Sequence, residues 1–180
     1  WLENCPVQDQ TAIEAGYAEL SNAMRASRPD VIIGMANDHL LNLPLIDPPD
    51  WRVDCAAHWC GPAEFFKSWL KQPGYEIDGR PDIANAIHDA ASAAGFNIDK
   101  DEGLLFDDNW SVPLWYLGYD VPIVPIHMNC INPPMPTPET WQSVYVMDIG
   151  ALLVFWPPTK TWKPAPLLLT EEQRLKWMFT

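Results

Sequence analysis

The sequence predicts an α/β fold: a single domain with a central mixed β-sheet flanked by helices. Apolar runs rich in β-branched residues occupy 31–36 and 121–128, and such runs are typical of buried strands. Apolar residues recur at spacings of three and four over 11–27 and 81–94, which indicates amphipathic helices. Helices that precede or separate buried strands favour a sheet that carries helices on its faces.

The helices have recognisable ends. Residues 28–30, Arg-Pro-Asp, stop the first helix, and the second begins at Pro81 and ends before Gly95. A shorter helix is expected at 61–71, with Pro62 near its first turn and its three aromatic side chains packed inward.

The remaining elements have weaker patterns. The strand at 121–128 contains Pro122 and Pro125, which a sheet tolerates at an edge or a bulge. Further expectations are a strand at 75–77, extended segments at 96–98 and 103–106, a helical or irregular segment at 112–118, a strand or buried helix at 144–156 and a helix at 170–179.

We divide the chain into a core at 1–138 and a proline-rich C-terminal segment of the same domain at 139–180. The prolines cluster at 44–49, 133–138 and 157–166, where we expect irregular structure. The chain starts with Trp rather than Met, which we interpret as a native start that is missing or processed away.

Composition excludes several classes of protein. The net charge of −13 disfavours nucleic-acid binding, because an acidic surface repels phosphate. The sequence has neither a long apolar window nor a signal-peptide pattern, so we expect a cytoplasmic protein without a membrane span. The four cysteines form no C-x-x-C pair and are expected to be reduced thiols. Hydrolase elbows and nucleotide-binding glycine motifs are also absent.

The most informative polar residues follow the first predicted strand. Asn37, Asp38 and His39 come directly after the run at 31–36, and the carboxyl ends of strands are the usual place for a site in an α/β fold. A neutral imidazole is a good ligand for ferrous iron. A single histidine is also common as a structural hydrogen-bonding residue. We interpret two other histidines, His58 and His127, as structural or surface residues.

Four segments resemble, in order and spacing, the class III extradiol ring-cleaving dioxygenase superfamily, with protocatechuate 4,5-dioxygenase beta subunits and gallate dioxygenases as the nearest types. The similarity spans about residues 11–138. The segments are RPDVIIGMANDHLLN (28–42), GPAEFFKSWLK (61–71), FDDNWSVPLWYL (106–117) and VPIVPIHMNCINPPMP (121–136).

This resemblance implies non-haem Fe(II) as cofactor and extradiol ring cleavage of a catechol-type aromatic acid, such as protocatechuate or gallate, by dioxygen. It also implies a part in aromatic compound catabolism and a homodimer or two-subunit assembly.

The resemblance assigns roles to four residues. His39 matches the iron-binding histidine of the Asn-Asp-His segment, and Glu172 faintly matches the late carboxylate ligand. Asp108 stands where the family has its acid–base histidine, and Asn109 stands in the following glycine position. Asn129 is expected to shape the substrate pocket.

The match is incomplete, so an alternative stays open. No histidine precedes His39 to act as the second imidazole ligand, and the Gly-Gly-x-Ser-His segment is absent. Aspartate is a weak base at neutral pH unless burial raises its pKa. The chain is then either an iron dioxygenase, an incomplete copy of one, or a catalytically inactive homologue that serves as a partner subunit or small-molecule-binding domain. In the last case Asp108 is a turn-capping carboxylate and Glu172 lies at a helix N-terminus.

Overall fold

The computed structural model describes residues 5–137 and 151–155. The helices are α1 (Val7–Ser27), α2 (Glu64–Leu70), α3 (Pro81–Ala93) and α4 (Asp108–Leu117). The strands are β1 (Ile32–Asn37), β2 (Trp51–Asp54), β3 (His58–Gly61), β4 (Tyr75–Asp78), β5 (Ile98–Asp101), β6 (Ile123–Met128) and β7 (Ala151–Phe155).

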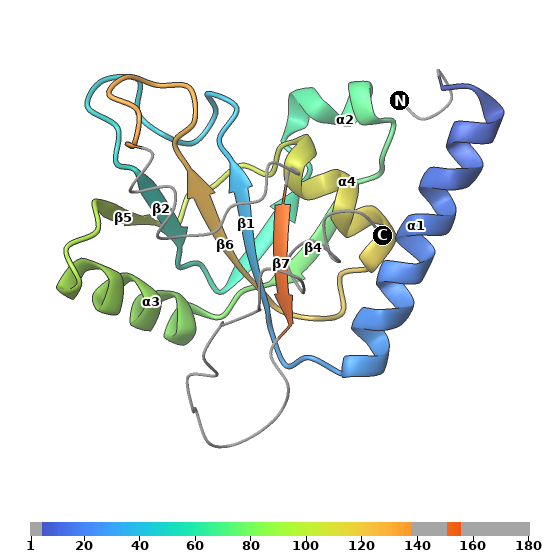
Figure 1. The fold of residues 1–180 in the computed structure, drawn as a ribbon, viewed down its shortest axis with the longest axis horizontal. Helices are drawn as coiled ribbons and strands as arrows, with labels where there is room; N and C mark the ends of the chain where they lie inside the picture. Colours follow the sequence, from blue (N-terminus) through green and yellow to red (C-terminus); the bar gives the residue numbers. More distant parts are fainter. Residues whose placement is uncertain (1–4, 138–150, 156–180) are drawn as a thin grey trace.

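The main sheet is mixed and has the strand order β5-β2-β6-β1-β7. β1 runs parallel to β6, and β2 runs parallel to β5. β2 is antiparallel to β6, and β7 is antiparallel to β1. A separate two-stranded sheet is formed by β3 and β4. Figure 1 shows this sheet with α3 on one side and α1 and α4 on the other, so the predicted fold class is confirmed.

Two apolar cores cover the two faces of this sheet. One packs α1, α4 and the small sheet against β1 and β6, with Ile32, Trp110 and Ile123 among its buried residues. The other packs α3 against the opposite face, with Val53 and Ala84 at its centre. Alternate side chains of a strand point to opposite faces, so β1 and β6 contribute to both cores.

The two long helices are confirmed, and α3 has the predicted start at Pro81. α1 begins four residues before the predicted position, at Val7. The expectation for 61–71 is wrong in part. The helix there is shorter and begins at Glu64, and Phe65 and Trp69 are exposed, while Leu70 is the buried residue. The three aromatic side chains lie near one another, with the Phe66 ring centroid 4.3 Å from that of Phe65 and 5.6 Å from that of Trp69, but α2 turns Leu70 and not this aromatic face to the core.

The predicted strands at 31–36, 75–77 and 121–128 are confirmed as β1, β4 and β6. β2 and β3 were not predicted, because WRVD and HWCG are each only four residues long and give too short a pattern to identify a strand. The extended segment expected at 103–106 is not a strand, and the one expected at 96–98 overlaps β5 only at Ile98.

Pro125 lies in an interior strand with unbroken pairing to β1, and not at an edge or a bulge as expected. The Pro122 and Met128 carbonyls accept hydrogen bonds from residues on the β1 side, so the backbone groups of Pro125 face β2. The β2 ladder covers only Trp51 to Val53, paired with Met128 to Ile126, and stops before Pro125. The missing N–H of this proline therefore costs no ladder hydrogen bond.

The structure tests only part of the predictions for the C-terminal segment. β7 shows that 151–155, within the apolar run at 144–156, forms a strand of the main sheet. The predicted helix at 170–179 lies outside the described residues, and the division at residue 138 stays a prediction. The four cysteines are free, as expected, and none of the described helices has the length and apolarity needed to cross a membrane.

Asp54 is a buried carboxyl at the end of β2. It is 2% exposed, and neither of its oxygens accepts a hydrogen bond of normal geometry from the described residues. Burial, and then the charge of Asp101, raise its pKa from 3.8 to about 8, against the opposing effect of Arg52.

We predict that Asp54 makes the fold less stable as the pH rises. A carboxyl whose pKa is raised in the folded state holds its proton more tightly there, so stability falls from about pH 4 to about pH 8. Asp54→Asn should raise the free energy of unfolding at pH 8.5 by about 1–3 kcal/mol and change it little at pH 4. Urea denaturation at both pH values measures this, with the exposed Asp47→Asn as the control; equal effects at both pH values would contradict it.

Candidate functional site

The candidate site lies where β1 ends and α4 begins. Asn37 is the last residue of β1, and Asp38 and His39 follow it. Asp107 and Asp108 lie at the start of α4, about 70 residues further along the chain. An Asn109 side-chain N–H donates to the Asn37 carbonyl at 2.8 Å, which joins these two segments.

Asp38 organises the loop that follows β1. Its carboxylate is 2% exposed and accepts hydrogen bonds from the backbone N–H groups of Leu41, Asn42 and Leu43, at 3.2, 2.8 and 3.3 Å. Burial alone would raise the pKa of Asp38, but the bond from His127 and these backbone bonds together hold it below its usual value. Asp38 is therefore an ionised, structural carboxylate.

His127 anchors Asp38 to β6 and α4. The Trp110 indole N–H donates to Nε2 of His127 at 2.6 Å, so a neutral ring carries its proton on Nδ1. Nδ1 lies 3.4 Å from Asp38 Oδ1 and 3.2 Å from the amide nitrogen of Asn42. Burial lowers the pKa of His127, which keeps the ring neutral. Both ring nitrogens are thus engaged, and His127 has the structural role that the sequence suggested.

Trp110 needs a glycine opposite it. Its ring stacks on His127 with centroids 5.4 Å apart, and it lies against Gly34 in β1. A Cβ atom built on Gly34 would overlap the Trp110 ring, so any larger residue there displaces the indole.

His39 lies in a group of polar side chains on the other side of the loop. Its Nδ1 is 3.1 Å from Asp108 Oδ1 and 3.7 Å from Asp107 Oδ2. Its Nε2 is 3.1 Å from the amide nitrogen of Asn109. The side chain of His39 is 41% exposed, that of Asp108 is 26% exposed, and that of Asp107 is fully buried.

Asp107 lacks a partner that matches its burial. Neither of its oxygens accepts a hydrogen bond of normal geometry from the described residues. Burial, followed by the charge of Asp108, raises its pKa from 3.8 to about 7, and His39 opposes this increase. A buried carboxylate in this position is stabilised by a proton or by a cation.

These residues fit a divalent cation. One imidazole nitrogen and one oxygen from each of Asp107 and Asp108 lie within 4.8 Å of one another, and the unpartnered Asp107 oxygens are part of this group. Imidazole and carboxylate are ligands that ferrous iron accepts. The group differs from a two-histidine, one-carboxylate triad, because His39 is the only imidazole that joins it among residues 5–137.

The other predicted site residues have different outcomes. Asn129 is buried, donates to the Asn132 and Pro134 carbonyls and accepts the Asn132 N–H, so its side chain holds the loop after β6. Its role in binding substrate stays a prediction, and Glu172 lies outside the described residues. Asp107 and Asn109 contact His39 but were not predicted to be part of the site. Their position beside Asp108 was the available signal.

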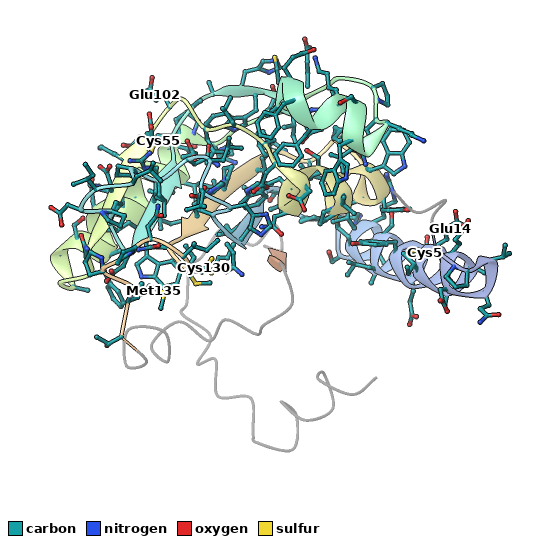
Figure 2. All side chains as sticks on the ribbon, turned by 90° about the horizontal axis from the view of Figure 1, so that it is seen from above. Cys5, Glu14, Cys55, Glu102, Cys130 and Met135 are labelled. Carbon is teal, nitrogen blue, oxygen red and sulfur yellow. The ribbon has the colours of Figure 1, made fainter. Side chains whose placement is uncertain are left out.

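Two other features lie away from this group. A hollow of about 410 Å³ is lined by Cys55, Asn85, Lys100, Asp101 and Glu102. It lies beyond the carboxyl end of β2. Because β2 is antiparallel to β6, and β6 is parallel to β1, this end of the sheet is opposite to the end that carries His39. Figure 2 shows Cys55 and Glu102 together there, with Cys130 in the separate loop after β6. An exposed group of His58, Cys60 and Glu76 crosses the small sheet.

We predict that Gly34→Ala destabilises the protein by about 1–3 kcal/mol, because the methyl group displaces Trp110 and its bond to His127. Gly16→Ala is the matched control, since a Cβ atom on Gly16 in α1 meets nothing within 4 Å. It should be neutral or stabilising by up to about 1 kcal/mol. Urea denaturation of both variants decides this, and a Gly34→Ala protein as stable as Gly16→Ala would refute the packing argument.

Comparison with known proteins identifies the family of this chain. The family described as the catalytic LigB subunit of aromatic ring-opening dioxygenase matches residues 4–144, well over half of the 180 residues. No curated protein matches the chain. The matched range contains both segments that meet at His39 and the strands that carry them. The chain therefore belongs to the family of the catalytic LigB subunit of aromatic ring-opening dioxygenases.

Proposed function

We propose that this chain is a non-haem iron(II)-dependent extradiol dioxygenase that cleaves the ring of a catechol-type aromatic acid resembling protocatechuate or gallate. The observation that carries this proposal is the contact between His39 and Asp108 at 3.1 Å. These residues stand at the ligand and acid–base positions of the resembling segments. They are 69 residues apart in the chain and meet at the carboxyl end of β1.

His39 and Asp107 would hold the metal. The buried Asp107 oxygens accept no hydrogen bond of normal geometry from the described residues and lie 3.7 Å from His39 Nδ1, so a cation there would compensate the Asp107 charge more fully. Ferrous iron bound there supplies the electronic coupling that lets an aromatic diol react with dioxygen. Glu172, the carboxylate ligand suggested by resemblance, remains a further candidate.

Asp108 is the proposed proton acceptor. Its side chain is 26% exposed and so is accessible to a substrate hydroxyl, whereas Asp107 is buried. A base within hydrogen-bonding reach of a phenolic hydroxyl can remove its proton.

The loop after β6 is the proposed wall of the substrate site. Asn129 holds this loop through its bonds to Asn132 and Pro134, and the Asn129 N–H donates to the Asp50 carbonyl. A fixed loop beside the end of β1 limits where an aromatic acid can lie. A homodimer or two-subunit assembly in the cytoplasm, with an aromatic diol and dioxygen as substrates, completes the proposal.

A second candidate function is a catalytically inactive homologue that binds a partner subunit or a small molecule. One observation favours it: Asp108 and Asn109, the two residues that depart from the resembling Asp-His-Gly segment, contact both ring nitrogens of His39. In this reading the group is a closed hydrogen-bonded cluster and not a metal centre.

We predict that Asp108→Asn lowers kcat for ring cleavage at least 100-fold, because the amide cannot accept the substrate proton. The measurement is oxygen uptake, together with the absorbance of the ring-opened product, after anaerobic loading with ferrous iron. Protocatechuate and gallate are the substrates. Asp120→Asn is the matched control, since Asp120 is an exposed carboxylate paired with Arg25.

Activity in the wild type and in Asp120→Asn but not in Asp108→Asn would support the proposal. A wild-type protein that holds iron but cleaves neither diol would favour the inactive homologue. An Asp108→Asn enzyme with unchanged kcat would remove Asp108 from the proposed mechanism.

A further inference from the structure

Asn109 contacts the edge of His39 that faces away from the carboxylates. Its amide nitrogen lies 2.8 Å from the Asn37 carbonyl oxygen and 3.1 Å from Nε2 of His39. A single NH₂ group therefore reaches both a backbone carbonyl of β1 and the imidazole ring. It has two N–H bonds, one for each of these neighbours.

The orientation of this amide is determined by the Asn37 carbonyl. A carbonyl oxygen only accepts hydrogen bonds, so the NH₂ group and not the amide oxygen must face it. The second N–H then points at Nε2 of His39, which has to be the unprotonated nitrogen. In a neutral ring the proton is on Nδ1, where it faces Asp108 at 3.1 Å and Asp107 at 3.7 Å.

This tautomer opposes metal binding through either nitrogen. A cation at Nε2 has to displace the Asn109 N–H from the lone pair it occupies. A cation between Nδ1 and the carboxylates needs the ring proton to move to Nε2, where the new N–H would face the N–H of Asn109. Two donors at about hydrogen-bonding distance repel each other, so one of them loses its partner.

We propose that Asn109 is a positioning residue that holds His39 in its Nδ1–H tautomer and thereby lowers the affinity of the His39, Asp107 and Asp108 group for a divalent cation. The effect on affinity rests on the metal site of the proposed function. The effect on the tautomer stands on the hydrogen bonds alone.

Two variants separate the donor from the volume of the side chain. Asn109→Leu keeps a side chain of similar size without any N–H, and Asn109→Ala removes both. Each should raise the affinity for Mn(II) roughly tenfold, the effect expected when one opposing hydrogen bond is removed. Asn85→Ala is the matched control, because the Asn85 amide also donates to a backbone carbonyl, that of Pro81, but lies on α3.

The experiment combines two readouts on the full chain and involves no turnover. Electron paramagnetic resonance titration with Mn(II) alone gives the affinity. Side-chain ¹⁵N chemical shifts of the metal-free protein, assigned with His39→Ala, give the tautomer. We expect the wild type and Asn85→Ala to show an Nδ1–H ring and to bind Mn(II) less tightly than the Asn109 variants. Both Asn109 variants should show a mixed or Nε2–H ring and tighter binding.

The contrary outcomes are distinguishable. An Nε2–H ring at His39 in the metal-free wild type would overturn the inference outright. Equal Mn(II) affinity in the wild type and both Asn109 variants would overturn it while leaving the proposed metal site intact. No Mn(II) binding by any variant would overturn the effect on affinity together with the metal site, and would favour the inactive homologue.

Discussion

The buried carboxylate of Asp38 is the constraint on which this edge of the sheet depends. Three consecutive backbone N–H groups after β1 point at it, and His127 ties it to β6. The chain therefore turns sharply after Asn37 and places His39 beside the first turn of α4. Gly34 allows Trp110 to approach β1 closely enough to hold His127. The close packing of Trp110 against Gly34 within the sheet thus helps to determine the position of His39 at its end.

The buried carboxylates Asp38 and Asp107 at this end of the sheet are not equally compensated by neighbouring groups. Asp38 has its negative charge satisfied by hydrogen bonds, but Asp107 is fully buried without an equivalent partner, and Asp108 lies next to it. The imidazole of His39 is the shared neighbour of both the Asp107 and the Asp108 carboxylates. Such a shortage of positive charge is typical of sites that bind a cation, and it is also found where a buried carboxyl keeps its proton. The raised pKa of Asp107, about 7, expresses this shortage.

The sequence predicted the fold class and the position of His39, because β1 and β6 are long apolar runs and α1 and α3 have regular periodicity. It could not predict β2 or β3, because four residues are too few for an alternating pattern to identify a strand. Pro113 made 112–118 ambiguous, whereas α4 begins at Asp108. The burial of Asp107 and the contact of Asn109 with His39 depend on neighbours about 70 residues away, and no local pattern encodes them. Local pattern also misled in α2, where Phe65 and Trp69 are apolar but exposed.

We propose that His39 belongs to a metal centre at the carboxyl end of β1. The most direct test is the iron content of the protein after anaerobic loading with ferrous iron and removal of the excess, compared between the wild type, His39→Ala and His88→Ala. His88 is a histidine of α3 that pairs with Asp89. We expect about one iron per chain in the wild type and in His88→Ala, and loss of iron in His39→Ala. Iron retained in His39→Ala, or absent from the wild type, would contradict the assignment of His39 to a metal centre.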